Sequence, residues 1–394
     1  MTQDHPKLEQ AIRLLADLVA YPSVSCDGNR AITERIARLL DAAGARYWTQ
    51  SDATGTKLNL FASIGPDVPG GVILSGHTDV VPVLDQPWSS DPFTLRIEDG
   101  RLYGRGSCDM KGFVAACLAM APEFARRALC VPLHFAFTYD EEIGCFGAQA
   151  LTAELAARGV HPAAAIIGEP TMMQLVDGHK GCFEYTTWIT GREGHGSAPD
   201  LGVNAVEYAV KVTSKLLELR EALKTMAAPD CPFDPPHSTI NPGVLTGGQA
   251  HNIIPGRARI DWEMRPVQAS DADFVKEQLA DYIAQDLLPQ MQRIDPEAGI
   301  MTEVIAEVAG LERRDRNMAR DLVMELTGAN GTGLVPFGTE AGLFQGIGIT
   351  SVICGPGDIA QAHKPDEFLA RDQLNQCLIF LDRLGARLEA RSLD

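Results

Sequence analysis

The N-terminal half of the chain carries hydrophobic residues in two patterns. One is the helical spacing of amphipathic helices, and the other is the continuous apolar run of buried strands. Apolar side chains recur at helical spacing over Leu8 to Ala20, which ends before Pro22, and over Ala31 to Ala43, which Gly44 closes. Apolar strands that alternate with helices predict an α/β fold, with a largely parallel sheet and helices on both of its faces. The expected strands are 58–64, 72–75, 131–138, 163–167 and, much later, 350–354, and the expected helices between them are 112–127 and 148–158.

From about Phe183 the pattern changes to strand, helix, strand, helix, strand. The expected strands are 183–191, 253–265 and 301–309, and the expected helices are 204–223 and 271–287. Strands that alternate with period two predict a small α+β domain with one solvated sheet face. A helix at 317–326 then resumes the first pattern. We therefore predict a catalytic domain of residues 1–182 and 312–394 and an inserted domain of residues 183–311, with a surface loop over 227–242.

Size and charge narrow the class of protein. A chain of 394 residues exceeds what one hydrophobic core usually serves, which agrees with two domains. With 52 acidic and 34 basic residues the net charge is −18, which disfavours a nucleic-acid partner and leaves no basic patch for a membrane surface. We expect no signal peptide and no membrane span. Nine cysteines without a CxxC pair predict reduced thiols in a cytoplasmic protein.

Five segments place residues that bind metals or move protons directly after predicted strands or their turns. They contain His77 and Asp79, Asp109, Glu141 and Glu142, Glu169, and His363. We expect them to converge because parallel sheets bind ligands at the carboxyl ends of their strands. Carboxylates and imidazoles in this number, with one carboxylate left over for protons, are typical of a hydrolytic site with two zinc ions. Neighbouring Glu141 and Glu142 support this prediction, because two such charges repel each other unless cations neutralise them.

Each segment has a simpler interpretation when it is taken alone. His77 and Asp79 could be a buried histidine and a loop aspartate, although strand alternation points both the same way, so that Asp79 can hold the second imidazole nitrogen. Asp109 follows a glycine-rich turn and could be only a helix cap. We favour a bridging ligand, because its two oxygens can serve two ions. Cys108 is a soft ligand by type but is more typical of a packed residue.

The inserted domain has candidate residues of its own. His195 lies on a glycine-rich turn before the expected helix, and Asn252 precedes the expected strand that carries Arg265. An arginine fork and an amide suit a substrate carboxylate and an oxyanion. Taken alone, each of the three is more typical of a surface or turn residue.

The segments, in their order along the chain, resemble a known enzyme family. This is the di-zinc amidohydrolase family that includes acetylornithine deacetylase, succinyl-diaminopimelate desuccinylase, aminoacylase and glutamate carboxypeptidases. The resemblance covers nearly the whole chain, from the first helix to Glu367. The longer strings resemble the acetylornithine deacetylase branch most, whereas residues 227–252 depart from the better-known bacterial deacetylases. These strings are Asp140 to Gly147, Gly168 to Thr171, Gly338 to Ala341 and Gln361 to Glu367.

The resemblance implies a role for each residue of the predicted metal site. Position by position, the ligands of one zinc ion would be His77, Asp109 and Glu169, and those of the other would be Asp109, Glu142 and His363. Asp79 would orient the first histidine, and Glu141 would be the general base.

For the inserted domain, the resemblance implies that it pairs two subunits into a homodimer. His195 would reach into the partner's site, and Arg265 and Asn252 would hold the substrate. Glu340 lies where other branches carry different residues, and we consider it a candidate contact for the ammonium group of ornithine.

The implied reaction is metal-dependent hydrolysis of a small N-acyl amino acid, with N-acetyl-L-ornithine to L-ornithine and acetate, a step of arginine biosynthesis, as the leading case. A succinylated diamino acid, another N-acyl amino acid or a dipeptide stays open as the substrate. A catalytically silent small-molecule-binding protein on the same fold is the alternative of another class, and it would have no need of Glu141 and a full ligand set. Cobalt or manganese could replace zinc at these ligands.

Overall fold

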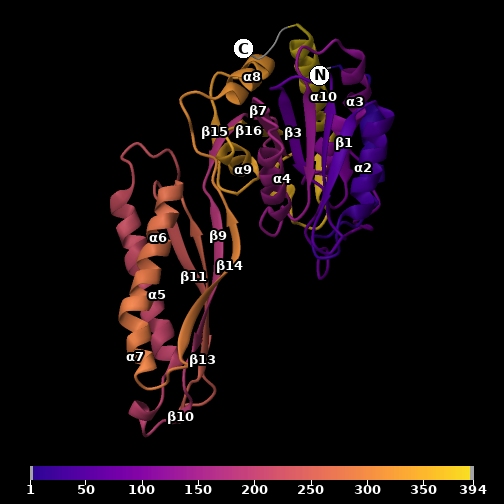
Figure 1. The fold of residues 1–394 in the computed structure, drawn as a ribbon. Coiled ribbons are helices and arrows are strands. Elements are labelled where there is room, and N and C mark those ends of the chain that lie inside the picture. Colours follow the sequence, from indigo (N-terminus) through magenta and orange to yellow (C-terminus); the bar gives the residue numbers. More distant parts are fainter. Residues whose placement is uncertain (1–2, 391–394) are drawn as a thin grey trace. The chain divides into compact units, whose positions relative to one another are not determined.

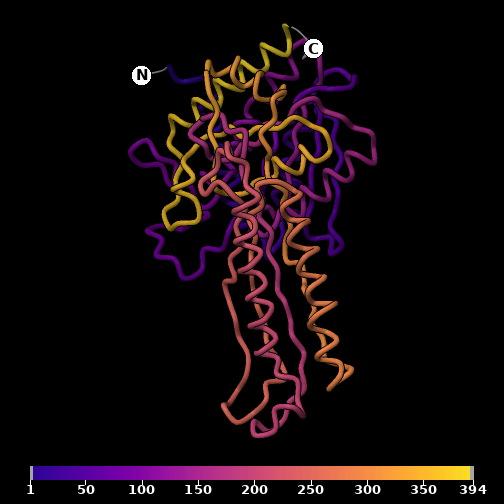
Figure 2. The backbone as a smooth tube through the Cα atoms, turned by 90° about the vertical axis from the view of Figure 1, so that its left-hand side faces the viewer, coloured from indigo at the N-terminus to yellow at the C-terminus, as the bar shows by residue number. Residues whose placement is uncertain are grey.

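The computed structural model describes residues 3–390, which form two compact units. Unit 1 consists of the chain up to Gly178, Arg313–Val335 and the chain from Thr339 onward, and unit 2 consists of His179–Glu312 and Pro336–Gly338. Both ends of the described chain lie in unit 1, so unit 2 is built from two internal stretches (Figures 1 and 2). The roles predicted for the two domains, catalysis and pairing, stay predictions.

The centre of unit 1 is an eight-stranded sheet in the order β1-β2-β6-β3-β7-β16-β8-β15. The neighbours β6, β3, β7 and β16 pair in parallel, whereas β1, β2 and β8 pair antiparallel to their neighbours. Every residue of β3, β6 and β7 is buried, as expected for strands covered on both faces. The strands are β1 (Arg46–Ser51), β2 (Leu58–Ile64), β3 (Val72–His77), β6 (Leu133–Thr138), β7 (Ala164–Pro170), β8 (Val176–His179), β15 (Gly333–Val335) and β16 (Thr350–Gly355).

Helices cover both faces of this sheet, which confirms the predicted fold class. The chain passes from β3 to β6 through α3 and returns from β6 past β3 to β7 through α4. Right-handed crossovers that run in opposite directions place their helices on opposite faces. Helices α1, α2, α8 and α10 lie on the same face of the sheet as α3, and α9 lies on the same face as α4. The bounds are α1 (Leu8–Val19), α2 (Arg30–Ala42), α3 (Lys111–Arg126), α4 (Phe146–Ala157), α8 (Met318–Thr327), α9 (Ala341–Gly346) and α10 (Arg371–Ala390).

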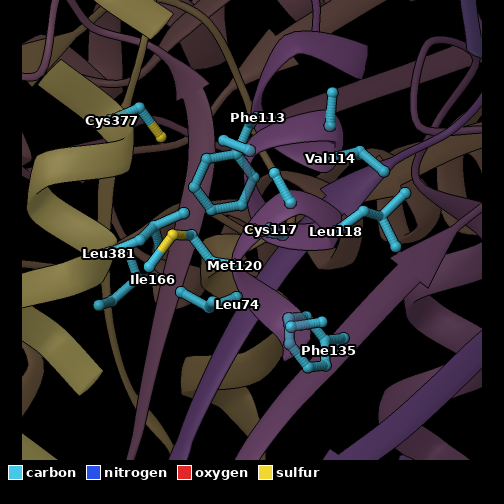
Figure 3. Packing of buried hydrophobic residues seen from close by; sticks show 14 of the residues in the cluster. Leu74, Phe113, Val114, Cys117, Leu118, Met120, Phe135, Ile166, Cys377 and Leu381 are labelled. Atoms are coloured by element: carbon cyan, nitrogen blue, oxygen red, sulfur yellow. The ribbon is translucent and has the colours of Figure 1, made fainter. Parts of the chain in front are cut away.

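The main core of unit 1 forms around α3, which is buried along most of its length. Figure 3 shows Phe113 and Met120 of α3 among buried side chains of β3, β7 and α10, which include Leu74, Ile166 and Leu381 and are inaccessible to solvent. Because α3 begins two residues after Asp109, this packing also fixes the start of the helix beside the predicted ligand.

A second, three-stranded sheet in unit 1 joins two distant loops. Its order is β17-β5-β4, with β4 at Arg96–Glu98, β5 at Arg101–Tyr103 and β17 at Phe368–Ala370. Strand β5 leads into the loop of Asp109, and β17 follows the loop of His363. The antiparallel pairing of β5 with β17 therefore holds the two loops next to each other.

Unit 2 is an antiparallel sheet in the order β11-β13-β9-β14 with helices on one face. Apolar residues of β13 and β9 alternate with exposed ones and pack against α5 and α6 in a second core. A short ribbon, β10 with β12, lies at the end of this sheet where β13 begins. The elements are β9 (Cys182–Thr190), β10 (Gly194–His195), α5 (Ala205–Met226), β11 (Thr239–Gly247), β12 (Ile253–Ile254), β13 (Arg257–Arg265), α6 (Ala269–Tyr282), α7 (Leu288–Gln292) and β14 (Gly299–Val308).

Some predicted elements of unit 2 need correction. The expected loop 227–242 ends in the edge strand β11, whose residues are too exposed to give an apolar pattern. The expected strand 253–265 is split into β12 and β13 around Pro255. The expected helix 271–287 begins earlier, and after Tyr282 it widens into a π-helical turn that leads to α7. Among residues 3–390, no helix is long and apolar enough to cross a membrane.

Candidate metal centre

The carboxyl end of the parallel sheet carries four of the predicted site residues. His77 is the last residue of β3 and Glu169 lies near the end of β7, and both are buried. Glu141 and Glu142 follow β6 in a turn and are partly exposed. Because β6, β3 and β7 are parallel neighbours, their carboxyl ends deliver these four side chains to one edge of the sheet.

Asp109 lies between the two predicted histidine ligands. Its Oδ1 atom is 3.1 Å from Nε2 of His77, and its Oδ2 atom is 3.3 Å from Nε2 of His363. Oε1 of Glu169 is 3.7 Å from the first imidazole nitrogen, and Oε2 of Glu142 is 3.0 Å from the second. The centre therefore has two halves, each with one imidazole and one glutamate, and the carboxylate of Asp109 faces both.

The side chains of this centre supply donor atoms that suit divalent cations. The structure places His77, Asp109 and Glu142 with one ligand atom each within 4.8 Å of one another, and it does the same for His77, Glu141 and Glu169. Both groups share His77, and neither is one of the two predicted ligand sets. Oε1 of Glu169 is buried and has no hydrogen-bond partner in the described part of the chain, which is costly for a carboxylate unless a cation takes that place. Imidazole with carboxylate is a donor set that zinc, cobalt and manganese accept.

Burial and neighbouring carboxylates raise the pKa values of the three glutamates of this centre. Burial, together with the charge of Asp109, raises the pKa of Glu142 to about 7 and the pKa of Glu169 well above its ordinary value. Burial and the charge of Glu142 likewise raise the pKa of Glu141, although His77 opposes them. Metal binding to such acids releases protons, because a carboxylate ligand must be deprotonated.

The two imidazoles have the opposite balance. Burial would lower the pKa of His77, but hydrogen bonds to Asp109 and Asp79 raise it well above the ordinary value. Hydrogen bonds to Asp109 and Glu142 raise the pKa of His363 to about 10. Burial would raise the pKa of Asp109, but the hydrogen bonds from both histidines hold it below its usual range.

Asp79 supports both His77 and the turn of the two glutamates. Nδ1 of His77 is 2.9 Å from the backbone oxygen of Asp79 and 3.6 Å from its Oδ1 atom, so the backbone carbonyl is the nearer partner. The carboxylate accepts a hydrogen bond of 2.7 Å from Oγ of Ser25 and longer ones from the backbone N–H groups of Glu141 and Glu142. Asp79 thus ties the end of β3 to the turn after β6.

Glu141, the predicted general base, has one side-chain hydrogen bond in the described chain, a weak one of 3.5 Å from the thiol of Cys145. The turn returns at Cys145, a buried residue with a φ of +53° whose backbone N–H donates to the carbonyl of Glu141. A carboxylate that a turn holds in place and that has few hydrogen bonds of its own suits the chemistry of a general base.

The structure places Glu340 below the sheet edge rather than at the surface. Its side chain is 1% exposed, and it accepts hydrogen bonds from Oγ of Ser75, at 2.9 Å, and from Oγ1 of Thr138. Burial raises the pKa of Glu340, although these hydroxyl groups oppose the shift. Contact with an ammonium group of the substrate stays a prediction, and it would require this carboxylate to become exposed.

In unit 2, the structure brings two of the three predicted residues together. His195 pairs with Ile253 in the ribbon, next to Asn252, whose carbonyl accepts from the N–H of Gly196. The imidazole is exposed, and its Nδ1 atom lies 2.8 Å from Oγ of Ser197. Arg265 lies at the other end of the sheet, since β13 begins beside the ribbon and ends at this residue, and it bonds Glu263 at 2.9 Å.

Sequence reasoning missed a buried ion pair beside the centre. Nη1 of Arg105 is 2.6 Å from Oε2 of Glu367, and both side chains are 1% exposed. In the sequence, Glu367 is only the last residue of the string Gln361 to Glu367. The signal available in the sequence was weak, because an arginine near a glycine-rich turn and a glutamate after a polar loop are both typical of surface positions.

Known proteins are similar to this chain along most of its length. A model of the peptidase family M20/M25/M40 matches residues 73–386. The chain is 35% identical over 371 residues to an acetylornithine deacetylase of Proteus mirabilis, with 92% of each chain covered. It is 36% identical over 370 residues to an acetylornithine deacetylase of Shigella sonnei, with 92% of this chain and 94% of the relative covered. The chain belongs to the M20 family. It is therefore a member of a family of hydrolases, and the resemblance noted from its motifs is confirmed.

Solved structures of M20 members share the fold. A tripeptidase of Staphylococcus aureus superposes with a TM-score of 0.72 at 19% identity, over 98% of this chain and 99% of that one. An M20 metallo-carboxypeptidase of Sulfolobus solfataricus gives 0.71 at 19% identity, over 98% and 100%. A dinuclear metal-binding M20 peptidase of Bacillus subtilis gives 0.66 at 15% identity, over 98% and 99%. At such identities the likeness is one of fold.

Proposed function

We propose that this M20 protein is a metal-dependent amidohydrolase that removes an acetyl group from N-acetyl-L-ornithine, yielding L-ornithine and acetate. The observation that carries the proposal is the placement of Asp109 between two imidazole–glutamate pairs. The substrate rests on the identity of 35–36% to proteins named acetylornithine deacetylase. The reaction would be a step of arginine biosynthesis in the cytoplasm. The nine cysteines are all free thiols, which suits that reducing compartment.

In this proposal His77, Asp109 and Glu169 would hold one zinc ion, and Asp109, Glu142 and His363 would hold the other. Cobalt or manganese could take the place of zinc. Bound cations supply positive charge that polarises an amide carbonyl and makes water more acidic. Asp79 fixes His77 through its backbone carbonyl and its carboxylate.

Glu141 carries the proton in the proposed reaction. Its carboxylate accepts a proton from water while the water oxygen forms a bond to the amide carbon. Glu141 then donates that proton to the amide nitrogen as the carbon–nitrogen bond breaks, so the acyl group leaves as the acid and the amino acid leaves as the amine. Glu141 is partly exposed, so its carboxylate is within reach of solvent.

We further propose a homodimer that forms through unit 2. Both edge strands of its sheet expose neighbouring apolar residues, Val244 and Leu245 on β11 and Val304 and Ile305 on β14, which suit a partner surface. His195 would act as an oxyanion donor in the partner's site, and its Nε2 atom has no bond among the described residues. Asn252 and Arg265 would contact the substrate.

A substrate panel tests the proposed reaction. Zinc- and cobalt-loaded protein is assayed with N-acetyl-L-ornithine, a succinylated diamino acid, other N-acetyl amino acids and dipeptides, with and without a chelator. We expect the largest kcat/KM with N-acetyl-L-ornithine and loss of activity with the chelator. A larger kcat/KM for another member of the panel would contradict the substrate, and no hydrolysis of any would favour a silent binding protein.

A further inference from the structure

His363 is the one predicted ligand that a long loop must hold. It lies between a short 3-10 turn, Ile359–Gln361, and β17, with a φ of +63° and a side chain that is 53% exposed. His77, in contrast, ends a buried strand and is oriented by Asp79. Among the described residues none bonds Nδ1 of His363, so apart from the contacts of Nε2 with Asp109 and Glu142 the direction of its ring depends on how its backbone is held.

A buried arginine holds that backbone. Nε2 of Gln86 donates to the carbonyl of His363 at 3.0 Å, and Oε1 of Gln86 accepts from Nη2 of Arg105 at 2.6 Å. The same guanidinium donates to the carbonyl of Lys364 at 3.4 Å and lies over the ring of Trp88, 5.1 Å from its centroid. Arg105 thus reaches the residues on both sides of one peptide bond in the ligand loop.

Glu367 connects this arginine to the other loop of the centre. Its Oε2 atom accepts from Arg105, and its Oε1 atom accepts from the backbone N–H groups of Cys108, at 2.9 Å, and Asp109, at 3.1 Å. One carboxylate therefore joins the bridging ligand to the loop of His363. Replacing a buried ion pair by apolar residues is often neutral or stabilising, so folding alone gives no reason for this pair.

We propose that Gln86, Arg105 and Glu367 are positioning residues that set the place of His363, and with it the affinity of the cation shared by Asp109, Glu142 and His363. The inference rests on the proposed two-cation site. It predicts that substitutions of these residues lower the metal affinity of only one half of the centre. The half with His77 and Glu169 is built on β3 and β7 and takes no hydrogen bond from Gln86 or Arg105.

Three substitutions separate the parts of this arrangement. Gln86→Ala removes the bond to the carbonyl of His363 and leaves Glu367 in place. Arg105→Lys keeps the charge but loses the planar fork that reaches several acceptors at once. Glu367→Gln keeps an oxygen that can accept from the backbone N–H groups of Cys108 and Asp109. Its NH2 group, a donor, then faces the guanidinium of Arg105, which is also a donor, so the bond to Arg105 is lost.

The test is a calorimetric titration of metal-free, full-length protein with Zn²⁺, with circular dichroism as a check of folding. His363→Ala identifies which of the two binding phases belongs to its half of the centre. In each of the three variants we expect that phase to weaken by about 10- to 100-fold, the range typical of lost partners around metal ligands, and the other phase to stay unchanged. Arg127→Lys is the matched control, since Arg127 forms a 2.6 Å pair with Asp382 in the same unit and touches none of these residues.

Equal weakening of both phases, or no change in either, would overturn the inference. If Arg105→Lys fails to fold, Gln86→Ala carries the test, because that side chain is only partly buried. In a protein that already lacks the imidazole of His363, Gln86→Ala should leave the remaining phase unchanged, and a further loss there would also contradict the inference. Wild-type protein with fewer than two binding phases would contradict the proposed function itself, whatever the variants do.

Discussion

At the scale of single residues, the centre depends on one carboxylate that faces two imidazoles. The sequence predicted the members of this centre because each follows a buried strand or a turn next to one, where parallel sheets bind ligands. It did not predict the supports behind them. Ser25, Ser75 and Thr138 are ordinary polar residues in sequence, and only the fold brings their hydroxyl groups to Asp79 and Glu340.

Glu141→Gln separates proton transfer from metal binding. The amide keeps the shape of the side chain but cannot accept a proton, so we expect kcat to fall by about 10²- to 10⁴-fold. Metal content, measured by atomic emission, should stay as in the wild type, because Glu141 is not among the proposed ligands. Wild-type activity in this variant would remove Glu141 from the mechanism, and loss of metal would make it a ligand instead.

His134 gives a pH dependence of stability that is independent of the centre. Burial lowers its pKa from the usual 6.5 to about 4, and Oγ of Ser63 lies 2.7 Å from its Nδ1 atom. Between these pKa values the unfolded chain binds a proton that the folded chain does not, so the free energy of unfolding falls as the pH drops from about 6.5 to 4. At about 1.36 kcal/mol per unit this amounts to about 3 kcal/mol.

The measurement for His134 is chemical denaturation of metal-free protein across pH 4 to 8, compared with His134→Gln. The variant should lose stability less steeply on acidification, by up to about 1.4 kcal/mol per pH unit, and above about pH 7 the difference between the two should be constant. Parallel curves over the whole range would show that this imidazole keeps an ordinary pKa in the folded protein.

At the scale of elements, the apolar strands were predictable and the polar ones were not. Strands β2, β3, β6, β7 and β16 are buried runs, and each begins within two residues of its expected start. Strands β1 and β11 lie at sheet edges, and their mixed exposure leaves no period to detect. The small sheet of β4, β5 and β17 also escaped prediction, because strands of three residues carry too little pattern.

Close packing of β7 against α3 gives a prediction at this scale. Gly168 precedes Glu169, and a Cβ atom there would overlap the ring of Phe113, which is buried in α3. Gly168→Ala should therefore lower the free energy of unfolding by about 1–3 kcal/mol, because neither the ring nor the strand has room to move. Gly346→Ala, at the end of α9 with nothing within 4 Å, is the control and should cost nothing. Equal stability of both variants would contradict the packing.

At the scale of the whole molecule, the sequence indicated two domains from the change of period near Phe183. The structure divides the chain at Gly178 and His179 and again at Glu312 and Arg313. Neither the hydrophobic periodicity nor the net charge of the sequence predicts pairing between subunits. Such pairing depends on which apolar residues stay exposed after folding. The unfolded chain cannot bring the ligands of the centre together, so metal binding should stabilise only the folded protein.

Linkage between metal and folding is measurable by thermal unfolding. Free zinc at 100 times its dissociation constant should add about 2.7 kcal/mol per site to the free energy of unfolding, and so raise Tm. Asp109→Asn should remove most of this gain, because its side chain keeps one oxygen and loses the charge that faces both halves. A wild-type Tm that does not respond to zinc or to a chelator would contradict a centre that binds cations in the folded state.

The most direct test of the central claim is an anomalous difference map at the zinc edge, from crystals of the full-length protein grown with zinc. The account predicts two peaks, one on each side of the Asp109 carboxylate, the first next to His77 and Glu169 and the second next to Glu142 and His363. A map with no peak beside Asp109, or with a single peak that only one of the two imidazoles reaches, would contradict it.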